Sequence, residues 1–194
     1  MKRWELKISR GFDPRTQKQV GLFAAQLDDQ LKRLKESVKE MTVEQLEWQL
    51  NPGMNTVGML LAHLPVAEVF WVNVAANGIP FEPEGDALIE KILGIKDDGI
   101  PLPADGVHPA QLKGWTLEQY LKLIDKGRRS VLRDMKKWRD RGLNDVYQIG
   151  KKTQATRIAM IYHVLEHFCG HYGQILLLKH LMRDAGIMEK PQKG

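Results

Sequence analysis

Apolar residues recur along the chain at helical spacing, and the pattern predicts four long helices. In residues 16–41 the apolar positions alternate steps of four and three, which is typical of a helix that buries one continuous seam in a bundle. Comparable stripes predict further helices over residues 56–77, 116–139 and 153–185. The seam of the first helix consists of Val20, Ala24, Leu27, Leu31, Leu34, Val38 and Met41.

Capping residues support these helices at their N-terminal ends. Thr116 followed by Gln119 has the spacing of a capping box, in which the two side chains bond each other's backbone N–H groups. Thr42 with Gln45 repeats the spacing and predicts one or two helical turns over residues 42–50. Together these elements predict an all-α fold, a four-helix bundle.

A long connection joins the second and third predicted helices. Residues 78–115 are rich in Gly and Pro, and a connection of this length inside a compact domain is more often functional than idle. We expect it to be a crossover and a candidate lid, with a short helical turn near residues 86–93 and His108 on its surface. Residues 142–152 should form a loop or a brief strand, and residues 1–194 a single domain.

The composition argues against several classes of function. The 29 basic residues are interspersed with 24 acidic ones, for a net charge of +5, and no basic stripe or arm marks a nucleic-acid surface. No apolar run approaches the roughly 18 residues that a membrane span requires. The single cysteine, Cys169, cannot form an intrachain disulfide and fits a reducing compartment. We therefore expect a cytoplasmic protein that binds neither nucleic acid nor membrane.

Three of the six histidines lie four residues apart in the last predicted helix. Side chains four apart lie on one helix face, so His163 with His167, or His167 with His171, can hold one metal ion between two turns. His163 and His171 cannot share an ion, because eight residues of helix separate them by about 12 Å. Both adjacent pairs remain open, although the apolar stripe that continues into Leu178 favours the second. A third ligand must come from elsewhere, and His63 lies at the edge of the second helix's buried stripe.

The polar positions of the last helix favour a metal site over a plain helix face. His167, His171 and Gln174 interrupt an otherwise apolar stripe. An imidazole buried there without a partner would cost about 1–3 kcal/mol. Neutral imidazole is the commonest side-chain metal ligand and suits zinc, nickel, copper or iron. Three imidazoles on one ion would leave a coordination position open, which is typical of a catalytic site.

Two segments resemble a known family. The run His163-Val-Leu-Glu-His167-Phe-Cys-Gly-His171-Tyr-Gly-Gln174, with Thr56-Val-Gly-Met-Leu-Leu-Ala-His63-Leu upstream, is similar to the DinB-like metal-dependent superfamily. The resemblance implies that His63, His167 and His171 bind the metal and that Gln174 is the matching amide one turn further on. It also implies a helical bundle, a homodimer, and an activity among thiol-dependent transferases and putative hydrolases. Tyr172 stands where an arginine is frequent in the family.

Other residues near these segments have competing interpretations. Glu68, five residues after His63, is a candidate general base or water-orienting group, or else a solvated helix carboxylate. His163 and Trp71 are expected to line the site without binding metal.

Further positions should serve packing and solvation. Cys169 is interpreted as a small buried apolar residue, and Gly170 and Gly173 as positions of close helix–helix approach. Arg128 and Arg129 should lie mostly on the wet side of the third long helix.

Three functions remain open from the sequence. In the first, one divalent ion, zinc or nickel, activates a low-molecular-weight thiol that attacks a small electrophilic substrate, as the family resemblance implies. In the second, the ion activates water to hydrolyse an ester or amide, with Glu68 or Gln174 positioning the water. In the third, the protein binds metal without turnover, as a stress-related sensor or interaction module.

Overall fold

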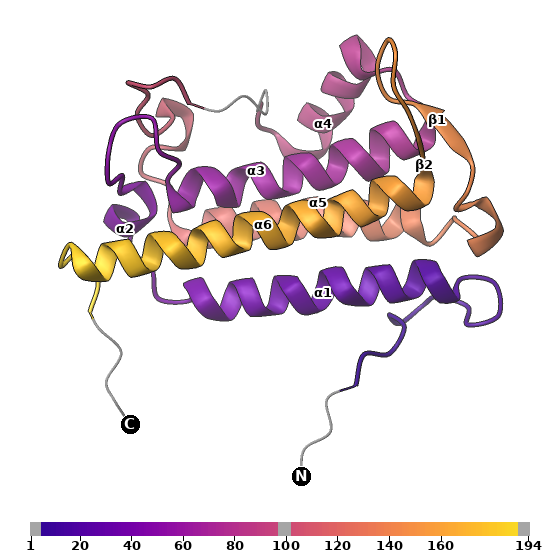
Figure 1. Cartoon of the computed structure of the whole chain (residues 1–194), viewed down its shortest axis with the longest axis horizontal. Coiled ribbons are helices and arrows are strands. Elements are labelled where there is room, and N and C mark those ends of the chain that lie inside the picture. The colour runs from indigo at the N-terminus through magenta and orange to yellow at the C-terminus, as the bar shows by residue number, and fades with distance from the viewer. Residues whose placement is uncertain (1–4, 97–101, 190–194) are drawn as a thin grey trace.

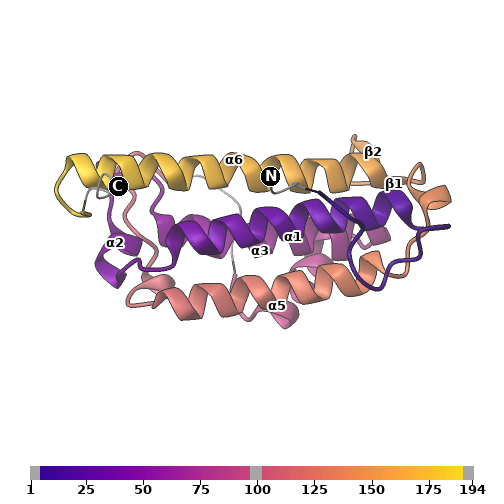
Figure 2. The ribbon, with the colours of Figure 1, turned by 90° about the horizontal axis from the view of Figure 1, so that it is seen from below.

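Four long helices lie side by side along the molecule (Figure 1). The computed structural model describes residues 5–96 and 102–189. The helices are α1 (Lys18–Val38), α3 (Val57–Val69), α5 (Leu117–Met135) and α6 (Arg157–Asp184). Figure 2 shows α6 and α5 on opposite sides of the layer that contains α1 and α3. The predicted all-α bundle is confirmed.

Shorter elements connect or extend the four helices. The π-helical turn η1 (Phe70–Val74) and the 3₁₀ turn η2 (Ala75–Asn77) prolong α3 without a break. A small antiparallel hairpin, in which Val146 pairs with Thr156, precedes α6. The remaining short elements are α2 (Val43–Glu47), η3 (Phe81–Gly85), α4 (Asp86–Leu93), η4 (Ala110–Leu112), η5 (Asp140–Gly142), β1 (Val146–Gln148) and β2 (Gln154–Thr156).

The predicted caps are formed. Thr42 with Gln45 begins α2, and Thr116 with Gln119 begins α5, each as a complete capping box. Thr56 caps α3, which carries His63, by accepting a hydrogen bond from a backbone N–H one turn into the helix. The local sequence therefore determines where these helices begin.

The direction of the helices explains the long connection. Gly58 of α3 contacts Tyr120 of α5, and further along both helices Asn73 donates a hydrogen bond to Asp134. Since the two helices run in the same direction, the chain must return along their length between them (Figure 1). The predicted crossover, with a helix at residues 86–93, is confirmed, and its role as a lid remains a prediction.

His108 is not the surface residue that we expected. Its side chain is half-buried, and its Nδ1 lies 2.7 Å from Oγ1 of Thr56, the capping residue of α3. The backbone N–H of His108 also donates to the side chain of Gln49. The expectation was wrong because the crossover folds back onto the start of α3, a contact between residues far apart in the chain.

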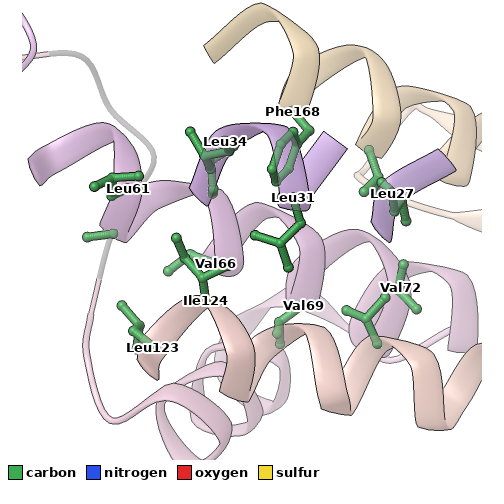
Figure 3. Packing of buried hydrophobic residues seen from close by; sticks show 14 of the residues in the cluster. Leu27, Leu31, Leu34, Leu61, Val66, Val69, Val72, Leu123, Ile124 and Phe168 are labelled. Carbon is green, nitrogen blue, oxygen red and sulfur yellow. The ribbon is translucent and has the colours of Figure 1, made fainter. Parts of the chain in front are cut away.

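The core lies where the four helices meet. Every residue of the predicted seam of α1 is buried. Figure 3 shows Leu27, Leu31 and Leu34 of this seam close to Phe168 of α6 and to apolar side chains of α3 and α5. By length and composition, Val57–Asn77 is the one helical stretch among the described residues that could cross a membrane, and 72% of its most apolar window is buried. A helix in a protein core is also apolar on all sides, so the burial of this stretch explains its composition.

A buried ion pair links three of the helices. Arg128 of α5 donates from Nε and Nη2 to the two carboxylate oxygens of Glu68 in α3, at 2.9 and 2.6 Å. Its Nη1 also donates to Asp28 of α1 at 3.2 Å. Arg128 is 4% exposed and Glu68 2% exposed, so both the expected wet position of Arg128 and the solvated interpretation of Glu68 are wrong. Each side chain is buried because it meets its partner from another helix.

Candidate metal centre

Three imidazoles from two helices meet at one point. His63 comes from α3, and His167 and His171 come from consecutive turns of α6, which packs beside α3. Nε2 of His167 lies 3.1 Å from Nε2 of His63 and 3.0 Å from Nε2 of His171. All three side chains are half-buried, and their candidate ligand atoms lie within 4.8 Å of one another. Of the two pairs that the sequence left open, His167 with His171 is the one that meets His63.

The geometry suits a shared cation. Two nitrogens that are each about 2.0–2.1 Å from one ion stand about 2.9 Å apart at a right angle and about 3.4 Å apart at a tetrahedral angle. The separations found at His167 fall in this range. A single Nε2 has one lone pair or one hydrogen, so His167 cannot serve both neighbours well by hydrogen bonding. A cation among the three nitrogens satisfies all of them at once.

Gln174 orients one of the three rings. Its Oε1 lies 2.9 Å from Nδ1 of His171. Since an amide oxygen can only accept, Nδ1 of His171 carries the hydrogen and Nε2 keeps its lone pair for a metal. Gln174 therefore acts on the candidate ligand His171, and this position supports an orienting role rather than a role as a base.

The environment keeps His167 neutral. Burial, followed by the neighbouring imidazoles of His171, His63 and His163, lowers the pKa of His167 to about 3. The imidazole therefore stays neutral throughout the physiological range, with a hydrogen on one ring nitrogen and a lone pair on the other, and protonation competes little with a metal ion.

His163 lies beside the cluster without joining it. Its ring centroid is 5.9 Å from that of His167, and its Nδ1 lies 3.3 Å from a carboxylate oxygen of Glu166. The ring of Trp71 packs against it at 4.8 Å, edge to face. His163 and Trp71 are thus neighbours of the cluster, as we expected.

The sequence missed part of these surroundings. Phe70 lies between Trp71 and Phe81 in a chain of ring contacts, with centroids 5.0 Å apart at each step. Phe81 lies in the Gly- and Pro-rich crossover, where no periodic pattern marks a residue as part of a site.

The carboxylate of Glu68 is occupied elsewhere. Both of its oxygens accept hydrogen bonds from Arg128 in the core. A general base needs a free lone pair close to the proton that it removes. This arrangement gives no support to the catalytic candidacy of Glu68.

The outer face of α6 differs from our expectation. Cys169 is exposed, so its interpretation as a buried residue is wrong. A Cβ added to Gly170 or Gly173 would meet no atom within 4 Å, so neither glycine marks a close approach inside the bundle. Close approaches between helices occur elsewhere, for example at Gly127 of α5, where an added Cβ would lie 2.8 Å from Cβ of Pro65. The error arose because the core covers only one side of α6.

The fold and the site together define a class of protein, the helical bundles that gather three histidines between two of their helices. Residues 26–175 match the DinB superfamily, and the chain belongs to this superfamily. The family resemblance drawn from the histidine segments is therefore confirmed. No curated protein matches the chain.

Two solved structures resemble the fold. A conserved protein of Enterococcus faecalis has a TM-score of 0.60 and 18% identity, over 82% of this chain and 94% of its own. A DinB-like protein from Bacillus cereus ATCC 10987 has a TM-score of 0.50 and 17% identity, over 93% of this chain and 100% of its own. At these identities the likeness shows the fold alone.

Proposed function

We propose that the protein is a divalent-metal-dependent thiol S-transferase. The proposal is carried by the three Nε2 atoms of His63, His167 and His171, which face one another in a half-buried position. Zinc or nickel held by three neutral imidazoles supplies Lewis acidity and lowers the pKa of a thiol that binds to it. The histidines hold the ion, and Gln174 orients the ring of His171. The substrates are a low-molecular-weight thiol and a small electrophile.

The residues around the cluster favour thiol transfer over hydrolysis. Metal-assisted hydrolysis commonly uses a carboxylate as general base beside the ion. The carboxylate of Glu68 is paired with Arg128, and that of Glu166 bonds His163, which lies outside the cluster. A thiolate needs no such base to attack carbon, because it is already a strong nucleophile. Hydrolysis and metal binding without turnover remain the two alternatives.

Consumption of thiol tests the proposal. Protein loaded with zinc or nickel is mixed with glutathione, cysteine or coenzyme A and with 1-chloro-2,4-dinitrobenzene, and the loss of free thiol is followed. We expect metal-dependent consumption that disappears with a chelator and falls by about 100-fold or more in His171→Ala, since one ligand to the ion is lost. The variant His180→Ala, on the exposed side of the same helix, should keep full activity.

Each alternative has its own result. Turnover of p-nitrophenyl acetate without thiol, with no thiol consumption, would establish the hydrolase in place of the transferase. Stoichiometric metal binding with neither activity would establish a metal-binding protein without turnover. The cytoplasmic location, the small-molecule partners and the lack of nucleic-acid or membrane binding remain predictions.

We also propose that the outer face of α6 binds a second copy of the chain. Tyr162 and Leu177 are each 58% exposed on this helix, and Leu176 is 38% exposed. From His167 to Leu178 the helix carries no Asp, Glu, Lys or Arg, which is unusual for a solvated helix face. Gly170 and Gly173 weaken the helix by about 1 kcal/mol each relative to alanine, and a second helix packed closely there would offset this loss.

Charge on this face should separate the two copies. We expect the wild type to sediment as a dimer at micromolar concentration and Leu176→Asp/Leu177→Asp to sediment as a monomer, because buried charges without partners oppose association. Val107→Asp is a matched control, since Val107 is 68% exposed in the crossover. A monomeric wild type at these concentrations would contradict the proposal.

A further inference from the structure

The open side of α3 and of its π-helical continuation is apolar and aromatic. From Val57 to Ala76 every side chain is buried except those of Met59, His63, Phe70 and Trp71, which are half-buried. Met59, His63 and Phe70 are separated by four and seven residues, so they follow one another along one helix face. The helix face that carries the candidate ligand His63 therefore also carries the aromatic ring of Phe70. π-Helical turns, such as the one that begins at Phe70, are frequent at functional sites.

Four rings join into one array beside the three-histidine cluster. We define the aromatic array as Phe81, Phe70, Trp71 and His163. Successive ring centroids lie 5.0, 5.0 and 4.8 Å apart, and each pair packs edge to face. The last ring, that of His163, lies 5.9 Å from the ring of His167. The array thus runs from Phe81, which is 47% exposed, to the candidate metal ligands.

The chemistry of the array selects one class of ligand. Three of its rings carry no ionisable group, and the hydrogen bonds and ion pairs of the described residues bring one ionised side chain to it, Glu166 at His163. The carboxylate of Glu166 lies at the array, and no lysine or arginine among the described residues forms a hydrogen bond or ion pair there. The array therefore does not suit a phosphate or a carboxylate ligand. Partly exposed rings at edge-to-face angles suit another flat ring, since aromatic pairs gain energy beyond the area that they bury.

We infer that the aromatic array binds an electron-poor aryl group of the electrophilic substrate and holds its reactive carbon beside the three-histidine cluster. The inference rests on the proposed thiol transfer. In that reaction the thiol sulfur forms a bond to an aryl carbon, and the bond from this carbon to a halogen breaks. The halide leaves with the bonding electron pair, and the thiol proton passes to solvent. Trp71 supplies the largest ring of the array, and Phe81 supplies its outer end.

Binding without turnover tests the array separately from the reaction. The probe is 2,4-dinitroaniline, which has the aryl group and no halide, titrated calorimetrically into metal-loaded protein without thiol. We expect Trp71→Leu and Phe81→Ala each to raise the dissociation constant by about fivefold, a typical loss for one aromatic contact. Trp115→Leu is the matched control, because Trp115 is also half-buried and packs on Tyr120 away from the array. Phe81→Ala removes an exposed ring, so it keeps the test valid if Trp71→Leu lowers the melting temperature.

Kinetics with two electrophiles complete the test. We expect Trp71→Leu to raise KM for 1-chloro-2,4-dinitrobenzene by about fivefold and to change the rate with iodoacetamide, which has no ring, by less than about twofold. Equal losses with both electrophiles, or unchanged binding of dinitroaniline in Trp71→Leu and Phe81→Ala, would overturn the aryl subsite. Binding of dinitroaniline through the array without any thiol consumption would support the subsite and overturn the proposed transfer.

Discussion

Replacing His167 by alanine is expected to weaken metal binding at least about 100-fold, the largest effect of any single ligand substitution. The reason is its central place, since its Nε2 lies 3.1 Å from that of His63 and 3.0 Å from that of His171. Without it the two remaining rings lie edge to face with their centroids 5.0 Å apart, and two ligands from different helices do not define a stable site. Zinc and nickel affinities are measured by calorimetry on protein without a histidine tag, and metal content by elemental analysis.

Two controls make this result specific. His163→Ala removes a neighbouring ring that is not in the cluster, so it should keep the metal. His63→Ala should also weaken metal binding, but less than His167→Ala does, because the pair His167 and His171 on α6 remains. Circular dichroism verifies that each variant remains helical. A wild-type affinity in His167→Ala would remove the basis of the proposed metal centre.

Replacing Arg128 by alanine should lower the free energy of unfolding by about 3–5 kcal/mol, because it leaves the carboxylate of Glu68 buried without its partner. Arg128 also donates to Asp28 and lies over the ring of Phe168, with its Cζ 5.7 Å from the centroid. Burial alone would lower the pKa of Arg128, but Glu68 and Asp28 outweigh burial and raise it, so the guanidinium stays charged. Urea denaturation measures the change.

The adjacent arginine and a double variant separate pairing from packing. Arg129→Ala removes an exposed charge one residue away and should change stability by less than about 0.5 kcal/mol. Arg128→Met/Glu68→Leu replaces both charges by apolar side chains of similar size and should recover much of the lost stability. If the double variant is no more stable than Arg128→Ala, the loss does not come from an unpaired buried charge.

Local patterns were sufficient to predict most of the helices. The seam of α1 repeats without interruption, and Thr42 and Thr116 begin their helices with side chains only three residues from their partners. The candidate site was also accessible, because His167 and His171 interrupt an apolar stripe at helical spacing. His63 was a candidate because it lies at the edge of the second helix's buried stripe, and the family resemblance then implied it as the third ligand.

Contacts between segments far apart in the sequence could not be predicted from local patterns. Arg128 and Glu68 are 60 residues apart, and either one alone looks like a residue on a solvated helix face. His108 is 52 residues from Thr56, and no local signal joins them. On α6 a small side chain such as Cys169 suggested burial, but only the packed structure determines which side of a helix the core covers.

Because α3 and α5 run in the same direction, a long crossover must join them, and the length and sequence of this crossover can vary. The entropy of closing a loop grows slowly with length, so a crossover roughly eight times longer than a tight turn adds only about 2 kcal/mol. Length and sequence can therefore vary in this connection at little thermodynamic penalty, while α3 and α6 keep His63, His167 and His171 in place. Since the same connection supplies Phe81 to the aromatic rings beside the histidines, this wall can vary in sequence while the three-histidine cluster stays unchanged.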